Sequence, residues 1–236
     1  IGTGLVGSEM CIRDRLELFD LLRIDHFRAL AGYWSVPGDD DTAQNGRWLP
    51  SPGRTILQRL QKRCGGLLPL IAEDLGVITP DVEALRDGLQ LPGMKVLQFA
   101  FDGNPANPYL PHNFAAGSWV AYTGTHDNAT AIGWWQELSP EQRTQVEAVL
   151  GHPVEAPGWQ LLRLALASTA DLAVVPLQDL MSLGDEARFN RPGTASGNWN
   201  WRLQGDLHAL DGHLSGLQQL AVCYDRGSGA PQSGTE

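Results

Sequence analysis

A repeated pattern constrains the fold of this chain more than any other feature of the sequence. A short apolar run ends in an acidic or polar residue, and a segment with helical signals follows. The pattern occurs five times in 236 residues, at 21–25, 68–74, 95–102, 119–127 and 172–179. Apolar runs of this length without alternation are typical of strands buried on both faces, as in parallel sheets. The sequence therefore predicts an α/β protein.

The segments between the runs carry helix start and stop signals. Thr79 and Ser139 each precede a proline, which is the order of an N-cap and a first helical residue. Gly151 and the glycines at 65–66 are placed to end helices. We expect helices at 54–63, 79–89, 139–150, 159–168 and 207–224.

Five consecutive strand–helix units predict either a doubly wound sheet or part of a (β/α)8 barrel. No GxGxxG or GxxxxGK[ST] loop follows any of the runs, so a nucleotide-binding sheet has little support. Acidic residues at the ends of several strands favour a barrel, because barrel enzymes carry their catalytic groups on that rim. We predict a partial (β/α)8 TIM barrel with about five parallel strands and surrounding helices.

Composition narrows the possible partners. The formal net charge of -10 argues against nucleic acid and against an anionic membrane surface. No apolar run approaches the ~18 residues of a membrane span. Three cysteines, Cys11, Cys64 and Cys223, are far apart and form no CxxC pair, so neither a disulfide framework nor a metal site is predicted. Such cysteine usage suits a reducing compartment, and we expect a cytoplasmic protein.

Asp25 is the first candidate catalytic residue. It ends a predicted strand, and Arg23 lies two residues earlier, on the same side of that strand. A guanidinium in this position holds a carboxylate ionised and oriented, as a nucleophile requires. A structural ion pair at the sheet edge explains these two residues equally well.

Glu73 is the second candidate. It follows four apolar residues at the end of the next run. A carboxyl group in apolar surroundings tends to keep its proton, which suits a general acid. Capping of the following turn by Glu73 or Asp74 is an equally good interpretation of the same residues.

The third polar strand end contains His126 and Asp127. Three carboxylates on one rim suggest glycoside chemistry, in which one attacks, one acts as acid and then base, and the third stabilises the transition state. A metal site is the competing use of such a cluster, but no HxxxH or HxH spacing supports it. Tryptophan is abundant, with eight residues, and an indole ring either fills a core or stacks on a sugar.

Six segments of the chain, taken together, resemble one known family. They read RIDHFRALAGYWSVP, GRWLPSPG, IAEDLGVITPDVEALRD, LPGMKVLQFAFDG, YTGTHDNATAIGWW and RFNRPGTASGNWNWR. These motifs resemble amylomaltases, the disproportionating 4-alpha-glucanotransferases, and the resemblance runs from about Leu16 to Leu207. It implies the C-terminal part of a (β/α)8 catalytic domain of the alpha-amylase type.

The resemblance also implies roles for individual residues. Asp25 matches the family's nucleophile, Glu73 its acid/base and Asp127 its transition-state stabiliser. Arg23 resembles the residue that holds the nucleophile, and His126 resembles a ligand of a sugar hydroxyl at the cleavage subsite.

Further substrate contacts are implied by the same motifs. The 190–199 loop resembles the one that lines the glucan groove, so we expect Asn190, Asn198 and Trp199 to bind substrate, together with Asn128. The family usually reads HDND where this chain has Ala129 as the fourth residue, and HFRGF where it has HFRAL at 26–30. Neither difference removes a catalytic group.

The two ends of the chain differ from the rest. Residues 1–14 do not resemble the family, and a cloning, sequencing or assembly artefact would account for them. We expect the barrel part to span 15–226. The tail at 227–236 is rich in Gly and Ser, and we expect it to be disordered.

The predicted function is that of a retaining 4-alpha-glucanotransferase, which moves an α-1,4-glucan segment to the 4-hydroxyl of another glucan or of glucose. The expected partners are α-1,4-glucans and maltooligosaccharides, and no cofactor or metal is needed for carboxylate chemistry. Two alternatives stay open. One is an alpha-amylase-type hydrolase with the same three carboxylates, and the other is a catalytically incompetent fragment that binds glucan.

Overall fold

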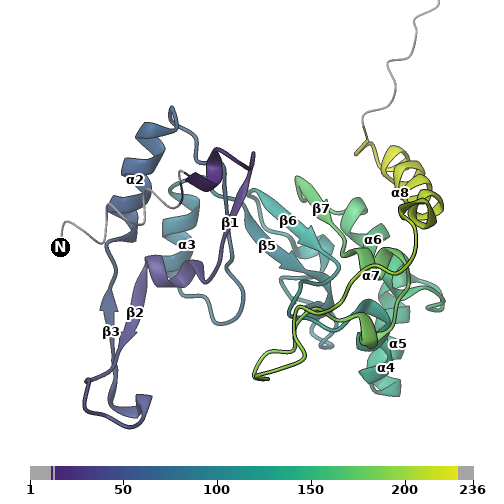
Figure 1. Cartoon of the computed structure of the whole chain (residues 1–236), viewed down its shortest axis with the longest axis horizontal. Coiled ribbons are helices and arrows are strands. Elements are labelled where there is room, and N and C mark those ends of the chain that lie inside the picture. The colour runs from purple at the N-terminus through teal and green to yellow at the C-terminus, as the bar shows by residue number, and fades with distance from the viewer. Residues whose placement is uncertain (1–11, 13, 228–236) are drawn as a thin grey trace, which may run out of the picture. The chain divides into compact units, whose positions relative to one another are not determined.

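The computed structural model describes residue 12 and residues 14–227 (Figure 1). The expected artefactual segment at 1–14 and the expected disordered tail at 227–236 therefore lie almost entirely outside the described residues. The chain divides into two compact units, one formed by 1–94 and 117–119 and the other by 95–116 and 120–236. Each unit is described by itself.

The first unit contains a parallel pair of strands. β1 (Leu22–Ile24) pairs with β4 (Leu70–Ala72), with Ile24 opposite Ala72 at the end of the ladder. All three residues of β4 are buried. The apolar runs at 21–25 and 68–74 thus form neighbouring strands, and the next residues along the two strands are Asp25 and Glu73.

An antiparallel hairpin lies between β1 and β4 in the sequence. It consists of β2 (Gly32–Ser35) and β3 (Arg47–Pro50), with Trp34 opposite Trp48 and their ring centroids 5.5 Å apart. Gly46 is required by the hairpin loop, because a Cβ there would lie 2.1 Å from the indole nitrogen of Trp34. The sequence did not predict this hairpin, since its strands are short and lack an apolar run.

Two helices complete the core of the first unit. They are α2 (Gly53–Arg63) and α3 (Pro80–Asp87), close to the predicted ranges. Leu57 of α2 and Val82 of α3 are almost completely buried and pack in one cluster with Phe27. Apolar burial on the inner faces of both helices therefore closes the core beneath the two parallel strands.

A buried ion pair lies directly behind Glu73. Asp74 pairs with Arg86 of α3, and it also accepts a hydrogen bond of 2.8 Å from the backbone N–H of Met94. The guanidinium of Arg86 stacks 4.6 Å from the centre of the Trp119 ring. Asp74 therefore fastens the end of β4 to α3 and to the segment around Met94.

The second unit contains most of a three-stranded sheet. Its strands are β5 (Gly93–Val96), β6 (Trp119–Tyr122) and β7 (Leu172–Val174), in that order, with β6 and β7 parallel. The helices are α4 (Ala131–Glu137), α5 (Pro140–Leu150), α6 (Pro157–Ala167), α7 (Leu177–Leu180) and α8 (Asp211–Cys223). Parallel strands with helices between them confirm the α/β class.

Several predicted elements differ in extent. The strand predicted at 95–102 is wrong, because β5 ends at Val96 and residues 97–99 form a 3-10 turn closed by the N–H of Ala100 on Leu97. The helix predicted at 207–224 begins with another 3-10 turn, at 207–210. Helix α4 was not predicted, and its N-cap is Thr130.

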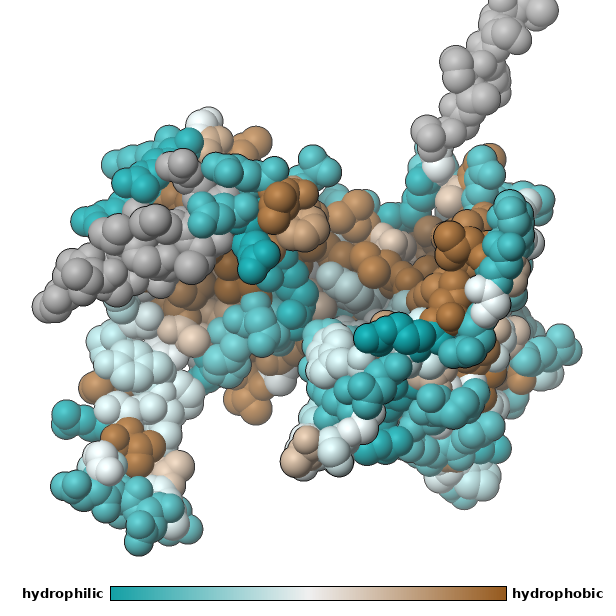
Figure 2. All heavy atoms as spheres, in the orientation of Figure 1, coloured by the Kyte–Doolittle hydropathy of each residue, from teal (hydrophilic) through white to brown (hydrophobic). Residues whose placement is uncertain are grey.

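Apolar side chains also reach the surface. Figure 2 shows brown, apolar residues among the hydrophilic ones on the visible face. On β7, an edge strand of its sheet, Leu172 is 45% exposed and Val174 is 41% exposed. Within residues 12 and 14–227, no helix has both the length and the apolar character that a membrane span needs.

Asp179 is a deeply buried carboxyl group of the second unit. It lies in α7, just after β7, and only 2% of it is exposed. It accepts hydrogen bonds of 2.7 Å from the Thr123 hydroxyl and from the backbone N–H of Ala131. Burial raises the pKa of Asp179 above the usual carboxyl value, although the bonds from Ala131 and Thr123 act in the opposite direction.

The ion pair of Asp74 supplies a first prediction. Asp74→Ala should lower the free energy of unfolding by about 3–5 kcal/mol, because the buried guanidinium of Arg86 loses its buried partner and keeps only the exposed Asp87. Burial alone would lower the pKa of Arg86, but its hydrogen bonds with Asp87 and Asp74 raise it. Asp87→Ala is the matched control, since Asp87 binds the same guanidinium but is 63% exposed. Its cost should stay within ~1 kcal/mol in urea unfolding; equal losses for the two variants would contradict the description.

The raised pKa of Asp179 predicts a pH dependence of stability. As the pH rises above ~3.9, the unfolded chain loses this proton first and the folded chain keeps it longer. Between the two pKa values the folded state binds more protons, so the free energy of unfolding falls as the pH rises. Asp179→Asn cannot titrate and should lack this component. Between pH 4 and pH 7, the urea midpoint of the original chain should fall relative to that of Asp179→Asn. Equal changes of the two midpoints with pH would refute the prediction.

Candidate active site

Asp25 is held by Arg23 at the end of β1. The guanidinium of Arg23 lies 2.9 Å from a carboxylate oxygen of Asp25, and its Nε also contacts the sulfur of Met94 at 3.3 Å. The side chain of Asp25 is 78% exposed in its unit. One of its oxygens is therefore paired with Arg23 while the carboxylate stays accessible to solvent. The alternation of the strand places both residues on one side, as the sequence predicted.

Glu73 lies opposite Asp25 on the neighbouring strand. The N–H of Glu73 donates to the carbonyl of Ile24 at 3.0 Å, and its carbonyl accepts from Phe27 at 3.1 Å. The pairing therefore continues one residue beyond the ladder, with His26 in a left-handed conformation at φ 49°. Neighbouring strands are about 4.7–4.9 Å apart, so this register places the backbones of Asp25 and Glu73 side by side.

The surroundings of the Glu73 side chain differ from those expected. Its carboxylate accepts a hydrogen bond of 2.6 Å from the N–H of His26 and another of 3.0 Å from the N–H of Leu75. The apolar pocket inferred from the preceding residues is wrong, because the buried apolar residues belong to the strand and Glu73 comes after it. The left-handed turn at His26 supplies one of the two donors.

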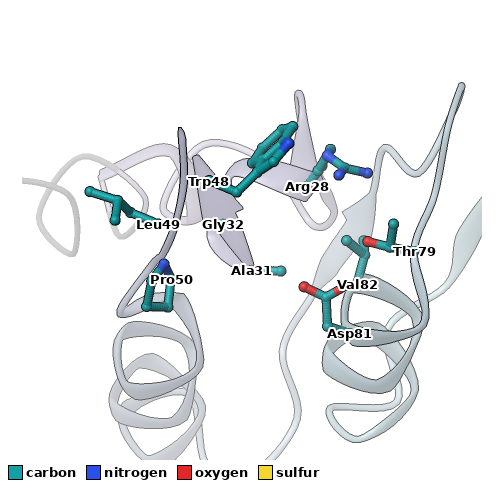
Figure 3. A pocket seen from close by; sticks show the side chains of 9 residues that line it. All are labelled: Arg28, Ala31, Gly32, Trp48, Leu49, Pro50, Thr79, Asp81 and Val82. Atoms are coloured by element: carbon teal, nitrogen blue, oxygen red, sulfur yellow. The ribbon is translucent and has the colours of Figure 1, made fainter. Parts of the chain in front are cut away.

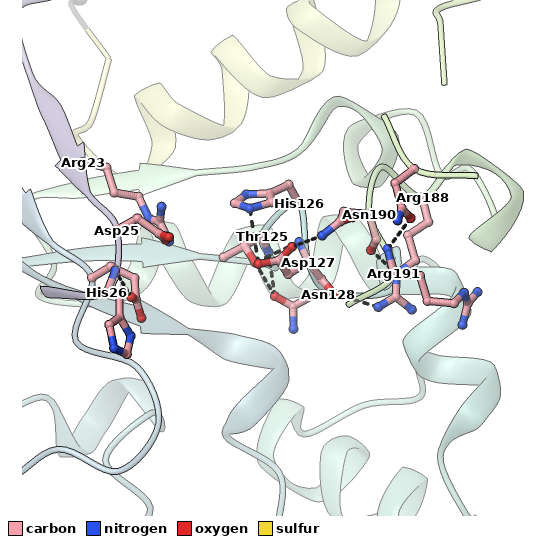
Figure 4. A network of polar contacts seen from close by, with 12 residues as sticks. Arg23, Asp25, His26, Thr125, His126, Asp127, Asn128, Arg188, Asn190 and Arg191 are labelled. Carbon is pink, nitrogen blue, oxygen red and sulfur yellow. Dashed lines mark hydrogen bonds and ion pairs between the residues drawn. The ribbon is translucent and has the colours of Figure 1, made fainter. Parts of the chain in front are cut away.

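Asp127 lies in a turn after β6. The Thr125 hydroxyl and N–H both donate to the side-chain oxygen of Asn128, at 2.7 and 2.9 Å, which closes the turn. Nε2 of His126 lies 3.3 Å from one oxygen of Asp127. Asn190 donates to the other oxygen at 2.5 Å. Figure 4 shows this network, in which both oxygens of Asp127 have a partner.

Arg188 joins the turn to the 190–199 loop. It donates 2.7 Å to the carbonyl of Asp127 and 2.8 Å to the carbonyl of Asn190. The N–H of Asn190 in turn donates to the carbonyl of His126 at 3.1 Å. One guanidinium therefore fixes the backbone on both sides of the contact between Asp127 and Asn190.

Aromatic rings border this cluster. The rings of His126 and Trp199 are 5.2 Å apart, and Phe189 lies 5.9 Å from Trp199. Trp199 is 55% exposed and has a positive φ of 61°. Its N–H donates to the carbonyl of Phe189 at 2.6 Å, which holds the indole beside the histidine.

The predicted site residues thus fall into two groups. In the first unit Arg23 and Asp25 are paired, and Glu73 follows the neighbouring strand. In the second unit contacts join His126, Asp127, Asn190 and Trp199. Two predicted ligands have structural tasks within their loops. Asn128 closes its own turn, and Asn198 accepts from Arg191 and donates to Thr194.

Sequence reasoning missed several residues of these networks. Thr125 and Arg188 were inside quoted motifs but received no role. Asp185 accepts from the N–H of Thr130 at 3.3 Å and pairs with Arg191 at 2.6 Å. Asp179 is the polar residue at the end of the fifth apolar run, and this position is the sequence feature that could have indicated a role for it.

A hollow of about 440 Å³ in the first unit takes no part in this cluster (Figure 3). Its lining includes Trp48 and Arg28 from the hairpin side and Asp81 from α3, and none of the predicted site residues. Arg28 stacks 4.4 Å from the Trp48 ring and donates to Val77. A hydrogen bond from Thr79 lowers the pKa of Asp81, so the polar groups of this hollow are engaged within the unit.

The described residues offer no metal centre. Among residues 12 and 14–227, no three His, Cys, Asp or Glu side chains are grouped so that they could hold a metal ion. The groups at the strand ends are carboxylates, a guanidinium, amides and aromatic rings. Carboxylates and aromatic rings are also the groups that enzymes use on glycosidic bonds, where carboxylates do the chemistry and aromatic rings face sugars.

Comparison with known proteins defines the family. The sequence profile of the 4-alpha-glucanotransferases matches residues 9–208. A 4-alpha-glucanotransferase of Synechocystis is 52% identical over 208 residues, which cover 87% of this chain and 41% of that protein. One of Thermus thermophilus is 51% identical over 219 residues, which cover 89% and 43%. The chain belongs to the 4-alpha-glucanotransferase family.

Solved structures agree with this assignment. An amylomaltase from Streptococcus agalactiae, in complex with acarbose, has a TM-score of 0.85 and 34% identity over 94% of this chain and 44% of its own. The amylomaltase of Corynebacterium glutamicum has a TM-score of 0.66 at 16% identity and supports the fold alone. The chain spans about two fifths of the length of the relatives it matches.

The bridge made by Arg188 gives a prediction for the second unit. Arg188→Met should lower the free energy of unfolding by about 1.5–3 kcal/mol, because charge-assisted bonds to two loop carbonyls are lost. Arg191→Met is the matched control, since Arg191 is 55% exposed where Arg188 is 14% exposed. The control should cost no more than ~1 kcal/mol. Thermal or urea unfolding measures both, and a larger loss for Arg191→Met would overturn the assignment.

Proposed function

We propose that this chain carries the reacting carboxylates of a retaining 4-alpha-glucanotransferase. The observation that carries the proposal is the register of β1 and β4, which puts Asp25 and Glu73 opposite each other on adjacent parallel strands. Retaining enzymes need their two working carboxyl groups roughly 5–5.5 Å apart, and strand spacing supports a separation of this size. Family membership supports the same reaction.

In the first half of the reaction, Asp25 is the nucleophile and Glu73 the acid. A carboxylate oxygen of Asp25 bonds to the anomeric carbon of an α-1,4-glucan, and the bond from that carbon to the leaving 4-oxygen breaks. Glu73 gives its proton to this oxygen. Arg23 pairs with one oxygen of Asp25 at 2.9 Å, which orients the carboxylate and leaves its other oxygen for the attack. The product is a glycosyl ester on Asp25.

In the second half, Glu73 is the base. It takes the proton from the 4-hydroxyl of an acceptor glucan or of glucose, whose oxygen bonds to the anomeric carbon as the ester bond to Asp25 breaks. Two inversions retain the α configuration. Asp127 is the proposed stabiliser of the oxocarbenium-like transition state, and the rings of His126 and Trp199 support contact with sugar at the same cluster.

The finer points of fold and location are part of the proposal. We infer that the parallel strands belong to a (β/α)8 barrel, which the similarity to the Streptococcus agalactiae amylomaltase supports. The substrates proposed are α-1,4-glucans and maltooligosaccharides, and the acarbose in that neighbour supports a glucan-like ligand. The cytoplasmic location stays a prediction.

A transfer assay tests the function. The chain is assayed alone and as a hybrid, in which it replaces the matching segment of the Thermus thermophilus relative, with maltotriose as substrate. Transfer should give glucose and longer oligomers; glucose and maltose alone would favour the hydrolase. A folded hybrid with neither activity would favour the incompetent glucan-binding fragment and overturn the proposal.

Two substitutions separate the carboxylate roles. Glu73→Gln should lower kcat on maltotriose by about 10²–10⁴-fold, because proton transfer is lost. The Glu73→Gln variant should still form the glycosyl ester from α-maltosyl fluoride, since fluoride leaves without a proton. Asp25→Asn should fail with both substrates. Asp20→Asn, just before β1, is the control, and its activity should be unchanged. Fluoride release by Asp25→Asn would contradict the assignment of Asp25 as the nucleophile.

A further inference from the structure

We propose that Asp179 is a positioning residue for Asp127, because its carboxylate holds both ends of the 123–131 segment. The proposal rests on the proposed function, in which Asp127 stabilises the transition state. One oxygen of Asp179 accepts from the Thr123 hydroxyl and the other from the N–H of Ala131, each at 2.7 Å. Asp127 lies midway between these two anchored residues.

Both anchors are rigid. Thr123 is completely buried and Ala131 is 1% exposed, at the first residue of α4. The N–H of Thr123 also donates to the carbonyl of Val174 at 3.3 Å, which continues the pairing of β6 with β7. Since Asp179 follows β7, a displacement of its carboxylate would move the start and the end of the segment together.

Between the anchors, other elements also hold the segment: Arg188 donates to the carbonyl of Asp127 at 2.7 Å, and Gln98 donates to the carbonyl of Ala129 at 2.9 Å. The turn from Thr125 to Asn128 is closed within itself, and such a turn fixes its own shape but not its place on the sheet. Asp185 accepts from Thr130 at 3.3 Å, a longer bond than the two made by Asp179. The carboxylate of Asp179 therefore fixes the two ends of the segment, on which the contacts at its middle depend.

The cost of burying Asp179 agrees with a geometric task. No ion pair of Asp179 occurs among the residues that the structure describes, so two neutral donors are its compensation for burial. A carboxylate carries two acceptor atoms on one planar group, which a smaller neutral side chain does not. These atoms fix the spacing between Thr123 and Ala131.

Three substitutions and one control test the proposal. Asp179→Ala removes both anchors, and Thr123→Val removes one without changing the shape. Asp179→Asn keeps both bonds, because the amide oxygen accepts from Ala131 and the amide N–H donates to the Thr123 hydroxyl. Gln160→Leu is the control: Gln160 is also buried and holds the 153–156 loop instead, through Glu155 and Pro153.

The activity readout is the split between kcat and KM in the active hybrid, with maltotriose. A displaced transition-state group lowers kcat, by about 10²-fold for a shift near 1 Å, and leaves KM little changed. Asp179→Ala should show this loss, Thr123→Val a smaller one, and Asp179→Asn should recover most of kcat. Gln160→Leu should lower stability without lowering kcat.

Hydrogen exchange of the backbone provides an independent readout in the chain itself. Asp179→Ala should accelerate exchange at 124–130 more than at 153–156, and Gln160→Leu should do the reverse. Equal kcat for Asp179→Ala and Gln160→Leu would overturn the proposal, as would unchanged exchange at 124–130. A folded hybrid without transfer would contradict the proposed function instead, and exchange alone would then decide whether Asp179 holds the segment.

Discussion

The pairing of β1 with β4 is the constraint on which the proposed chemistry depends. Parallel strands in register place residues of equal position side by side, so the first residues after Ile24 and Ala72 become neighbours. Those residues are Asp25 and Glu73. A shift of the register by one residue would turn Glu73 to the other face of the strand. The packing of β4 opposes that shift, because Leu70 and Ala72 would leave the apolar cluster that they share with α2 and α3.

Two of the three proposed catalytic carboxylates, Glu73 and Asp127, are supported by a buried one. Asp74 follows Glu73 and fastens the end of β4 to α3, while Asp179 holds the segment that contains Asp127. Only the outer group of each pair is accessible for chemistry. The inner groups have their hydrogen bonds satisfied by Arg86, by hydroxyl and by peptide donors, which makes them fixed points for loops that would otherwise move.

The strongly patterned parts of the chain could be predicted from sequence, and the irregular parts could not. Apolar runs gave the strands that end at Asp25 and Glu73, and capping signals gave the helix that begins after Ser139, where a capping box is present. The hairpin around Trp48 was missed because its strands are short and their pairing is specific to the fold. The peptide donors on Glu73 depend on the left-handed His26, which no sequence period indicates.

Capture of the covalent intermediate tests the central claim most directly. The Glu73→Gln hybrid, given α-maltosyl fluoride, forms the glycosyl ester but lacks the base that would release it. Mass spectrometry of its peptides should find a maltosyl group on the peptide that contains Asp25, and this group should be absent when Asp25→Asn is added. A maltosyl group on another residue, or an inverted product with no adduct, would contradict the assignment of Asp25 as nucleophile.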